Sequence, residues 1–269
     1  MSDELRLTIL GCGSSPGVPR VNGDWGACDP DEPKNRRRRC SALVERIGPD
    51  GTTVVVIDCG PDFRDQMLSA DVRHIDGIVV THAHADHIHG LDDIRSYVQG
   101  THELMNVYTD TPTIARLMEG FGYCFETPPG SSYPPIARLV EVQPGHTFRI
   151  EGAGGPVVIE PLAQIHGSIR SLGLLIGSLA YCSDVSDFPP ETVERLRGVR
   201  HLIIDALQHR PHPSHFSLGE ALQWIDTLAV ENAVLTHMHT PLDYRALRES
   251  LPDHVQPAYD GLTLRVRLA

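Results

Sequence analysis

Short apolar runs, separated by glycine, proline and polar residues, dominate the pattern along this chain. Each run has the length of a strand, and most are rich in valine, isoleucine or leucine, so they predict β-strands. The predicted strands cover residues 5–10, 40–47, 53–58, 77–81, 107–109, 157–160, 172–176, 179–182, 201–205, 233–236 and 262–268. Helices are predicted over residues 63–70, 113–119, 191–197 and 221–228, the last after an S-x-x-E capping box at residues 217–220. The mixture predicts an α/β fold whose helices pack on the outer faces of sheets.

No stretch of the chain has the composition of a linker, because proline and glycine are spread as turn residues. We therefore expect a single domain over residues 1–269. Apolar residues make up 41% and charged residues 22%, which fits a soluble globular protein and excludes a disordered one. The formal net charge of -12 disfavours a non-specific or processive nucleic-acid binder, since the phosphate backbone would be repelled.

Two features suggest a cytoplasmic protein without a membrane partner. The N-terminus is acidic where a signal peptide is basic, and its apolar stretch is short. The longest weakly polar run, residues 171–183, is shorter than the ~18 residues that a membrane-spanning helix needs. The six cysteines are scattered without a C-x-x-C pair, so we expect most of them to be buried thiols.

The segment THAHADHIHG at residues 81–90 has the composition of a metal site, since half of its residues are His or Asp. In extended backbone, side chains two residues apart point the same way, so His82 and His84 can bind one cation together. Asp86 and His87 follow where the chain must turn, and they can reach a second position. Imidazole and carboxylate without thiolate suit Zn, Mn or Fe. The alternative is a solvated loop without metal, but crowded histidines are costly unless a cation organises them.

A second segment repeats part of this pattern. GIVVTHAH at residues 77–84 and NAVLTHMH at residues 232–239 both lead from an apolar strand into T-H-x-H. Ligands of open α/β sheets bind beyond the carboxyl ends of strands, so both ends could face one site. The repeat is too short to establish a duplicated fold, and chance is the alternative.

The H-x-H-x-D-H pattern resembles the signature of the metallo-β-lactamase-fold hydrolases. Residues 54–63 (VVVIDCGPDF), 165–176 (IHGSIRSLGLLI), 179–188 (LAYCSDVSDF) and 234–244 (VLTHMHTPLDY) resemble further elements of that family. The resemblance implies a four-layer αββα sandwich, with two mixed sheets flanked by helices, and a site for two divalent metal ions. The implied ligands are His82, His84 and His166 for one ion, Asp86, His87 and His237 for the other, and Asp184 between the two.

The resemblance also suggests roles for residues beside these ligands. Asp58 would support the histidine loop from below without binding metal. Either His237 or His239 could be the last ligand, and His237 is favoured because it directly follows the strand and matches the family's T-H position. His239 would then face the cleft as a substrate contact, or face a neighbouring loop.

Other segments narrow the resemblance to the cytosolic phosphodiesterase branch, which includes the PhnP-type enzymes that open cyclic phosphates and is related to ribonuclease Z. These segments are GCGSSPGVPR (11–20), PKNRRRRCSALVE (33–45), HPSHFSLGEAL (212–222), THMHTPLDY (236–244) and AYDGLTL (258–264). PhnP-type enzymes carry clustered cysteines after the Gly-Val-Pro loop, which form a structural zinc site. Here VNGDWGACDP at residues 21–30 retains only Cys28. A structural zinc needs about four ligands, so we expect this extra site to be absent.

Three side chains are candidates for contact with the substrate. His215 matches the branch's active-site histidine that binds no metal, and a histidine can protonate a leaving alkoxide. His212 is a candidate substrate contact, and the alternative for both is that they cap the helix after residue 217. The arginine run at residues 36–39 is either a solvated face or a phosphate-binding group, with Arg38 as our candidate.

The resemblance implies hydrolysis of a small phosphodiester, either a cyclic phosphate or a nucleotide-like substrate. The nucleophile would be a hydroxide bridging two Zn or Mn ions, with Fe as an alternative, because such a water has a pKa near ~7. Asp86 would bind metal and orient the hydroxide, and His215 would assist the leaving group. A ribonuclease Z-like tRNA 3′ endonuclease is the first alternative, disfavoured by the acidic charge and the absence of a long basic insertion. Hydrolases of carbonyl substrates and a non-catalytic nucleotide- or metal-binding protein are further alternatives, and a homodimer is compatible with each.

Overall fold

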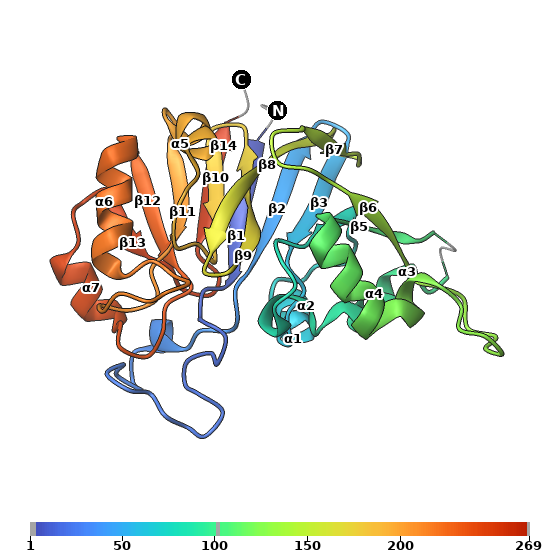
Figure 1. The fold of residues 1–269 in the computed structure, drawn as a ribbon, viewed down its shortest axis with the longest axis horizontal. Helices are drawn as coiled ribbons and strands as arrows, with labels where there is room; N and C mark the ends of the chain where they lie inside the picture. Colours follow the sequence, from blue (N-terminus) through green and yellow to red (C-terminus); the bar gives the residue numbers. More distant parts are fainter. Residues whose placement is uncertain (1–3, 101–102, 268–269) are drawn as a thin grey trace.

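The computed structural model describes residues 4–100 and 103–267. Within them, two seven-stranded sheets pack face to face, and helices cover the outer face of each sheet (Figure 1). The predicted four-layer αββα sandwich with two mixed sheets is therefore confirmed. The last residue of the strand predicted over residues 262–268 and the first three residues of the acidic N-terminus lie outside the described residues.

The strand order is β14-β1-β2-β3-β4-β5-β6 in the first sheet and β13-β12-β11-β10-β9-β8-β7 in the second. The strands of the first sheet are β1 (Glu4–Gly11), β2 (Ser41–Gly48), β3 (Gly51–Ile57), β4 (Gly77–Val79), β5 (Met105–Thr109), β6 (Ala137–Glu141) and β14 (Thr263–Arg267). Those of the second are β7 (Phe148–Ile150), β8 (Val157–His166), β9 (Ile169–Ile176), β10 (Leu179–Cys182), β11 (His201–Asp205), β12 (Asn232–Thr236) and β13 (Val255–Pro257). The helices are α1 (Phe63–Ser69), α2 (Ala85–Ile88), α3 (Arg95–Val98), α4 (Thr111–Phe125), α5 (Pro190–Leu196), α6 (Leu218–Leu228) and α7 (Tyr244–Ser250), with short 3-10 turns at Pro33–Asn35 and Leu91–Ile94.

Each sheet combines an antiparallel half with a parallel half. In the first sheet, β14, β1, β2 and β3 pair antiparallel, and β3 to β6 pair parallel. In the second, β7 to β10 pair antiparallel, and β10 to β13 pair parallel. The two T-H-x-H segments follow β4 and β12, which lie in the parallel halves of different sheets. Their carboxyl ends therefore open toward one edge of the sandwich, where open α/β sheets bind ligands.

Alternation along β3 shows how the sequence builds two apolar layers. Val55 and Ile57 point into the core between the sheets, whereas Val54 and Val56 point into a second core beneath the helices of the first sheet. Successive side chains of a strand point to opposite faces, so an uninterrupted apolar run predicts a strand buried on both sides.

The predicted strands and helices all occur within the described residues, with changes at their ends. The strand predicted over residues 77–81 ends at Val79, because the chain leaves the sheet before His82. The helix predicted over residues 113–119 runs from Thr111 to Phe125. The strands β6, β7 and β13 and the helices α2, α3 and α7 were not predicted, and most of them are too short to show a period.

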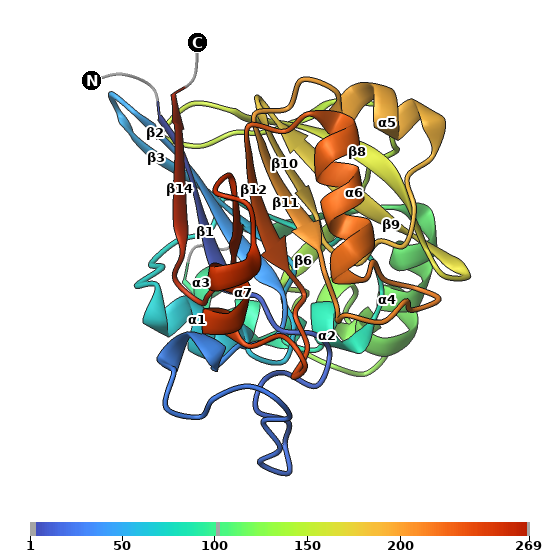
Figure 2. The same cartoon turned by 90° about the vertical axis from the view of Figure 1, so that its left-hand side faces the viewer.

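A long segment without regular sheet structure joins β1 to β2. It projects beyond the carboxyl ends of the parallel strands, and it is the blue segment below α1 and α7 in both views (Figures 1 and 2). All six cysteines are buried and free, as predicted. No helix among the described residues is long and apolar enough to cross a membrane.

Candidate metal centre

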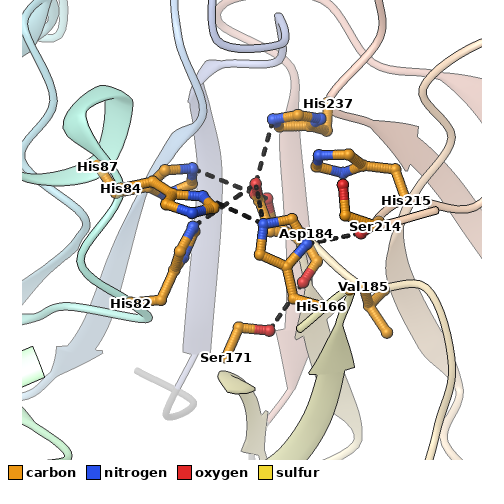
Figure 3. A network of polar contacts seen from close by, with 12 residues as sticks. His82, His84, His87, His166, Ser171, Asp184, Val185, Ser214, His215 and His237 are labelled. Carbon is orange, nitrogen blue, oxygen red and sulfur yellow. Dashed lines mark hydrogen bonds and ion pairs between the residues drawn. The ribbon is translucent and has the colours of Figure 1, made fainter. Parts of the chain in front are cut away.

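Side chains from both sheets converge at the edge where the parallel strands end (Figure 3). The structure brings all seven predicted ligands together in two groups, within each of which the ligand-type atoms lie within 4.8 Å of one another. The groups are His82, His84, His166 and Asp184, and Asp86, His87, His237 and Asp184. They follow β4, β10 and β12, form the end of β8 or lie in the first turn of α2, so several strand ends supply one cluster.

Asp184 lies at the centre of this cluster and belongs to both groups. Its Oδ1 is 3.2 Å from the Nε2 of His87, and its Oδ2 is 3.3 Å from the Nε2 of His237. The same Oδ2 lies 3.8 Å from the Nε2 of His82 and 3.9 Å from that of His166. The backbone of Asp184 is left-handed, with φ 54°. Left-handed backbone is uncommon for residues other than glycine and clusters at functional sites.

Asp58 supports the histidine loop in the way that the resemblance implied. It is fully buried and also has left-handed backbone, with φ 63°. It accepts hydrogen bonds from the backbone N–H of Thr81 at 2.8 Å and from the Nδ1 of His87 at 2.7 Å. Because Asp58 engages the Nδ1 of His87, its Nε2 is the nitrogen directed at Asp86 and Asp184.

Several ring nitrogens in the cluster have no hydrogen-bond partner. The Nε2 atoms of His82, His87 and His237 are buried and make no hydrogen bond within the described residues. The Nε2 of His166 and the Nδ1 of His84 face each other at 3.1 Å. Buried polar atoms without partners are costly, and a divalent cation bound by imidazole and carboxylate would satisfy them together. The donor set therefore fits divalent metal.

The two groups differ in their electrostatics. Burial lowers the pKa of His82, and the neighbouring His87 lowers it further. Burial also lowers the pKa of His84 and of His166, so the first group presents neutral imidazoles. These three histidines are ready to donate lone pairs at neutral pH.

In the second group, nearby carboxylates raise the pKa of the histidines more than burial lowers it. Burial acts to lower the pKa of His237, but Asp184 and Asp86 raise it to about 9. Burial likewise opposes a charged His87, yet Asp184, Asp58 and Asp86 raise its pKa well above the usual value. Protons therefore balance these buried carboxylates when no other cation does, and a metal ion would displace them.

His215 lies beside the cluster without belonging to either of these two four-residue groups. Its ring stacks on that of His237, with centroids 4.4 Å apart, and its side chain is 11% exposed. Its Nδ1 donates to the Oδ2 of Asp205 at 2.6 Å. Asp205 is fully buried and also accepts the backbone N–H of Val185. We did not predict the role of Asp205, although its position at the carboxyl end of an apolar strand was a usable signal.

The cluster opens to solvent on the side of His84, which is exposed. His212 is also exposed and lies at the same rim, with its ring centroid 5.3 Å from that of His215. Its Nδ1 is 3.2 Å from the Oγ of Ser214. This is the position that a substrate contact would need.

The structure places His237 in the cluster and His239 outside it. His239 is half-buried and faces a neighbouring loop, which was one of the two predicted alternatives. Its Nδ1 is 2.8 Å from the Oγ of Ser14, and its Nε2 is 2.6 Å from the NH2 of Arg20. The sequence indicated no role for Arg20, because its partner is distant along the chain.

Three of the four arginines in the run lie against the protein, whereas Arg36 is exposed. Arg38 donates from its Nε to Asp260 at 3.0 Å and from its NH1 to Asp65 at 2.8 Å. Arg39 pairs with Asp62 at 2.8 Å. The structure does not bring Arg38 into contact with the histidine cluster, so its predicted substrate role would require it to leave these carboxylates.

Hydrogen bonds fasten the segment after the Gly-Val-Pro loop to the turn that follows His237. Arg37 is 2% exposed and donates to the carbonyl of Leu242 at 2.7 Å. The Sγ of Cys28 donates to the carbonyl of Thr240, which also accepts the backbone N–H of Ala27 at 3.0 Å. Among the described residues, Cys28 belongs to none of the groups of ligand-type side chains.

Comparisons with known proteins agree with this geometry. The Beta-lactamase superfamily domain matches residues 53–238. The chain is 35% identical over 263 residues to an octanoyltransferase of Porphyromonas gingivalis, covering 96% of this chain but only 51% of that relative, so it spans about half of its length. It is 26% identical over 284 residues to a ribonuclease Z of Methanopyrus kandleri, covering 93% of this chain and 98% of that one. A crystal structure of a new diphosphatase from the PhnP family is similar with a TM-score of 0.88 and 34% identity, covering 100% of this chain and 99% of that one.

Proposed function

Because this chain belongs to the Beta-lactamase superfamily and has the fold of its metal-dependent hydrolases, we propose that it hydrolyses phosphodiester bonds of small substrates. Cyclic phosphates and nucleotide-like diesters are the proposed substrate class. The observation that carries this proposal is the pair of Asp205 and His215, which stacks directly on the ligand-type cluster through His237. A phosphodiester needs a proton donor for its leaving oxygen, and an imidazole held by a buried carboxylate can supply it.

The cluster would hold two divalent ions, with Zn or Mn as the proposed metals and Fe as the alternative. When bound, such ions lower the pKa of a coordinated water toward ~7 and neutralise charge on phosphoryl oxygens. Asp86 would help to hold the second ion and orient the attacking water. His215 would donate a proton from Nε2, because its Nδ1 is engaged by Asp205. His212, at the exposed rim, is the proposed contact to the rest of the substrate.

The similarity to ribonuclease Z makes cleavage of precursor tRNA the second candidate. Two observations favour a small substrate over tRNA. The net charge of -12 opposes a polyanion, and the Arg38 and Arg39 side chains of the projecting segment are paired with carboxylates of the protein itself. A non-catalytic nucleotide-binding protein is the third candidate, and a complete ligand-type cluster with an adjacent acid–base pair argues against it.

The similarity to an octanoyltransferase calls for a carbonyl substrate to be tested as well. Only about half of that relative aligns with this chain, so its name describes a longer protein. The diphosphatase similarity covers both chains almost completely, and it favours reaction at phosphorus. We therefore place a diphosphate ester beside the diesters in the substrate screen.

The experiment is a substrate screen with protein loaded separately with Zn and with Mn. The probes are bis(p-nitrophenyl) phosphate, a nucleoside 2′,3′-cyclic phosphate, a nucleoside diphosphate ester, precursor tRNA and p-nitrophenyl octanoate. We expect metal-dependent turnover of the diesters, with little on tRNA or the octanoate. Turnover of tRNA or octanoate alone, or tight nucleotide binding without any turnover, would overturn the proposal. Size-exclusion chromatography of the same samples tests whether the active species is a monomer or a homodimer.

A further inference from the structure

We propose that Arg20 binds a second, non-reacting anionic group of the substrate, and that His239 positions its guanidinium for this purpose. The inference rests on the proposed phosphodiester hydrolysis and narrows its substrate class to molecules with a further phosphate or carboxylate. Three observations lead to it: the contacts of Arg20, its place next to the loop of His237, and the engagement of Arg38 and Arg39 by carboxylates.

The contacts of Arg20 hold its guanidinium from two sides. Its NH2 is 2.6 Å from the Nε2 of His239, and its NH1 is 2.8 Å from the Oδ2 of Asp24. These contacts use two of the five N–H groups of an arginine. The other three have no protein acceptor within the described part of the chain, and the side chain is 40% exposed. Arg20 therefore presents free donors to solvent from a fixed position.

The hydrogen bonds of His239 define its tautomer. An arginine is always a donor, so the Nε2 of His239 must accept from Arg20. Its Nδ1 must then carry the proton and donate to the Oγ of Ser14 at 2.8 Å, and Ser14 is buried. A neutral ring held in this way orients the guanidinium without cancelling its charge. His239 is thus a positioning residue, which acts on the substrate only through Arg20.

The loop that carries His239 also carries His237 of the metal-type cluster. The two residues are separated by one position, so their Cα atoms are at most about 7.6 Å apart. Backbone hydrogen bonds from Met238 to Cys12 at 2.8 Å and from His239 to Leu207 at 3.0 Å hold the loop in place. The His239 side chain links Arg20 to this loop, so we assign the guanidinium to a group beside the reacting phosphate and not to the reacting phosphate itself.

The segment that carries Arg20 is fastened to the same loop. The backbone N–H of Ala27 donates to Thr240, and a Cβ on Gly26 would lie 2.6 Å from the side chain of Thr240. Gly26 has φ +57° there, so glycine allows both the turn and the close approach. The projecting segment is therefore held against the loop of His237, and Arg20 is in place before a ligand arrives.

The positive charge of Arg20 favours an anionic ligand. Arg37 is buried against backbone carbonyls, and Arg38 and Arg39 are paired with carboxylates and are only 20% and 25% exposed. Arg36 is exposed, and its guanidinium lies 5.2 Å from the ring centroid of Trp25. The pair of Arg20 with Asp24 is exposed on both sides, at 40% and 39%, and such pairs contribute little to stability. A phosphate can engage the free edge of a guanidinium with two parallel hydrogen bonds. In an acidic protein, Arg20 therefore supplies local positive charge for an anionic substrate.

The test uses two substrates that differ by one phosphate. These are thymidine 5′-(p-nitrophenyl phosphate) with and without a 3′-phosphate, which share the leaving group and the nucleoside. We expect wild-type protein to prefer the 3′-phosphorylated substrate in kcat/KM, mainly through KM. A charge-assisted hydrogen bond corresponds to roughly a 10- to 100-fold preference, and Arg20→Gln should abolish it. The exposed pair Arg116–Glu119 provides the matched control, and Arg116→Gln should keep the preference.

His239 is tested by two substitutions. His239→Ala should lose the preference, while His239→Gln should keep part of it, since an amide oxygen can accept from Arg20. The double variant Arg20→Gln/His239→Ala should lose no more than Arg20→Gln alone, because both act through one contact. An additive loss, or an equal loss in the alanine and glutamine variants, would reduce His239 to a structural residue and overturn its part of the proposal.

A binding measurement separates this inference from the proposed function. Thymidine 3′,5′-bisphosphate and thymidine 5′-monophosphate are titrated into metal-loaded wild-type protein and Arg20→Gln by calorimetry. Tighter binding of the bisphosphate that depends on Arg20 supports the inference even if neither diester is cleaved, in which case only the hydrolytic function fails. Turnover without any preference for the second phosphate, or a preference that Arg20→Gln retains, overturns the inference and leaves the function standing.

Discussion

Asp205 accepts a hydrogen bond from the Nδ1 of His215 at 2.6 Å, at the edge of a cluster in which neither side chain is a predicted ligand. The carboxylate is fully buried, and the imidazole stacks on His237. Burial of an acceptor beneath a partly exposed histidine is the arrangement of an acid–base pair, since the outer nitrogen stays free to act on a substrate. The ligand-type cluster and this pair therefore have separable roles.

Substitution of His215 tests this separation. In His215→Ala we expect turnover of an activated phosphodiester to fall by ~10²–10⁴, because the leaving oxygen loses its proton donor. Metal content should stay at the wild-type value, since His215 belongs to neither of the two four-residue groups that share Asp184. Steady-state kinetics and elemental analysis of the same preparation measure both. Asp205, His215 and His237 do have ligand-type atoms within 4.8 Å of one another, so loss of metal would identify His215 as a ligand instead.

Removal of the shared carboxylate should affect both groups of ligands. In Asp184→Ala we expect metal content to drop to about one ion per chain or fewer, because each group loses a ligand and three to four are needed. Equilibrium dialysis against a metal buffer, followed by elemental analysis, gives the stoichiometry. The exposed Asp187 provides a control on the same loop, and Asp187→Ala should bind metal as the wild type does. Retention of two ions in Asp184→Ala would contradict the bridging position.

Acidification should remove the ion of the second group first. The carboxylates around His237 overcome burial and raise its pKa to about 9, and the pKa of His87 is raised as well. Below pH 9 an ion must displace these protons, so its apparent affinity falls about tenfold per pH unit for each proton. Burial lowers the pKa of His82, so the first group stays deprotonated to lower pH.

Metal content measured by dialysis between pH 8 and pH 5.5 tests this order. We expect one ion to be lost well before the other as the pH falls. In Asp86→Asn the early loss of an ion on acidification should disappear, because the second group already binds its ion weakly at pH 8. Loss of both ions in a single step would show that the two groups do not titrate separately.

Much of the fold and of the ligand set follows from local features of the sequence. Apolar runs such as residues 54–57 are unambiguous because every residue of the strand packs on one of two cores. His82 and His84 are two residues apart, and in extended backbone this spacing is enough to point both side chains the same way. His237 follows the same T-H-x-H pattern at the end of another strand. Their convergence was predictable because parallel strands direct their carboxyl ends to one edge of a sheet.

The missed features depend on packing between distant parts of the chain. Arg20 and His239 are 219 positions apart, and Arg38 and Asp260 are 222 positions apart. No local pattern distinguishes an arginine that meets a carboxylate from one that remains free. The three-residue strands β7 and β13 are too short for periodicity to show, and neighbouring strands determine them. Sequence thus predicts which residues are candidates for chemistry, while tertiary packing decides which of them meet.

Gly60, in the loop that follows Asp58, packs against the helix α2, which carries Asp86 and His87 of the second group. A Cβ on Gly60 would lie 1.9 Å from the backbone carbonyl oxygen of Asp86. Non-bonded heavy atoms do not tolerate this distance, so Gly60→Ala must displace either the loop or α2. The backbone N–H of Cys59 also donates to the carbonyl of His87 at 2.9 Å, so displacement strains this contact as well.

In Gly60→Ala we expect the free energy of unfolding to fall by about 1–3 kcal/mol, the usual cost of overpacking. Metal affinity should fall with it, because Asp86 and His87 both move, whereas the first group should keep its ion. Urea denaturation with and without metal, together with metal content, measures these effects. Gly219 in α6 is the matched control, since a Cβ there meets nothing within 4 Å. Gly219→Ala should stabilise the protein by roughly 0.5–1 kcal/mol, because alanine is the better helix former. If Gly60→Ala instead has the same free energy of unfolding as the wild type and binds two ions, the close approach of the loop to α2 does not position the second group.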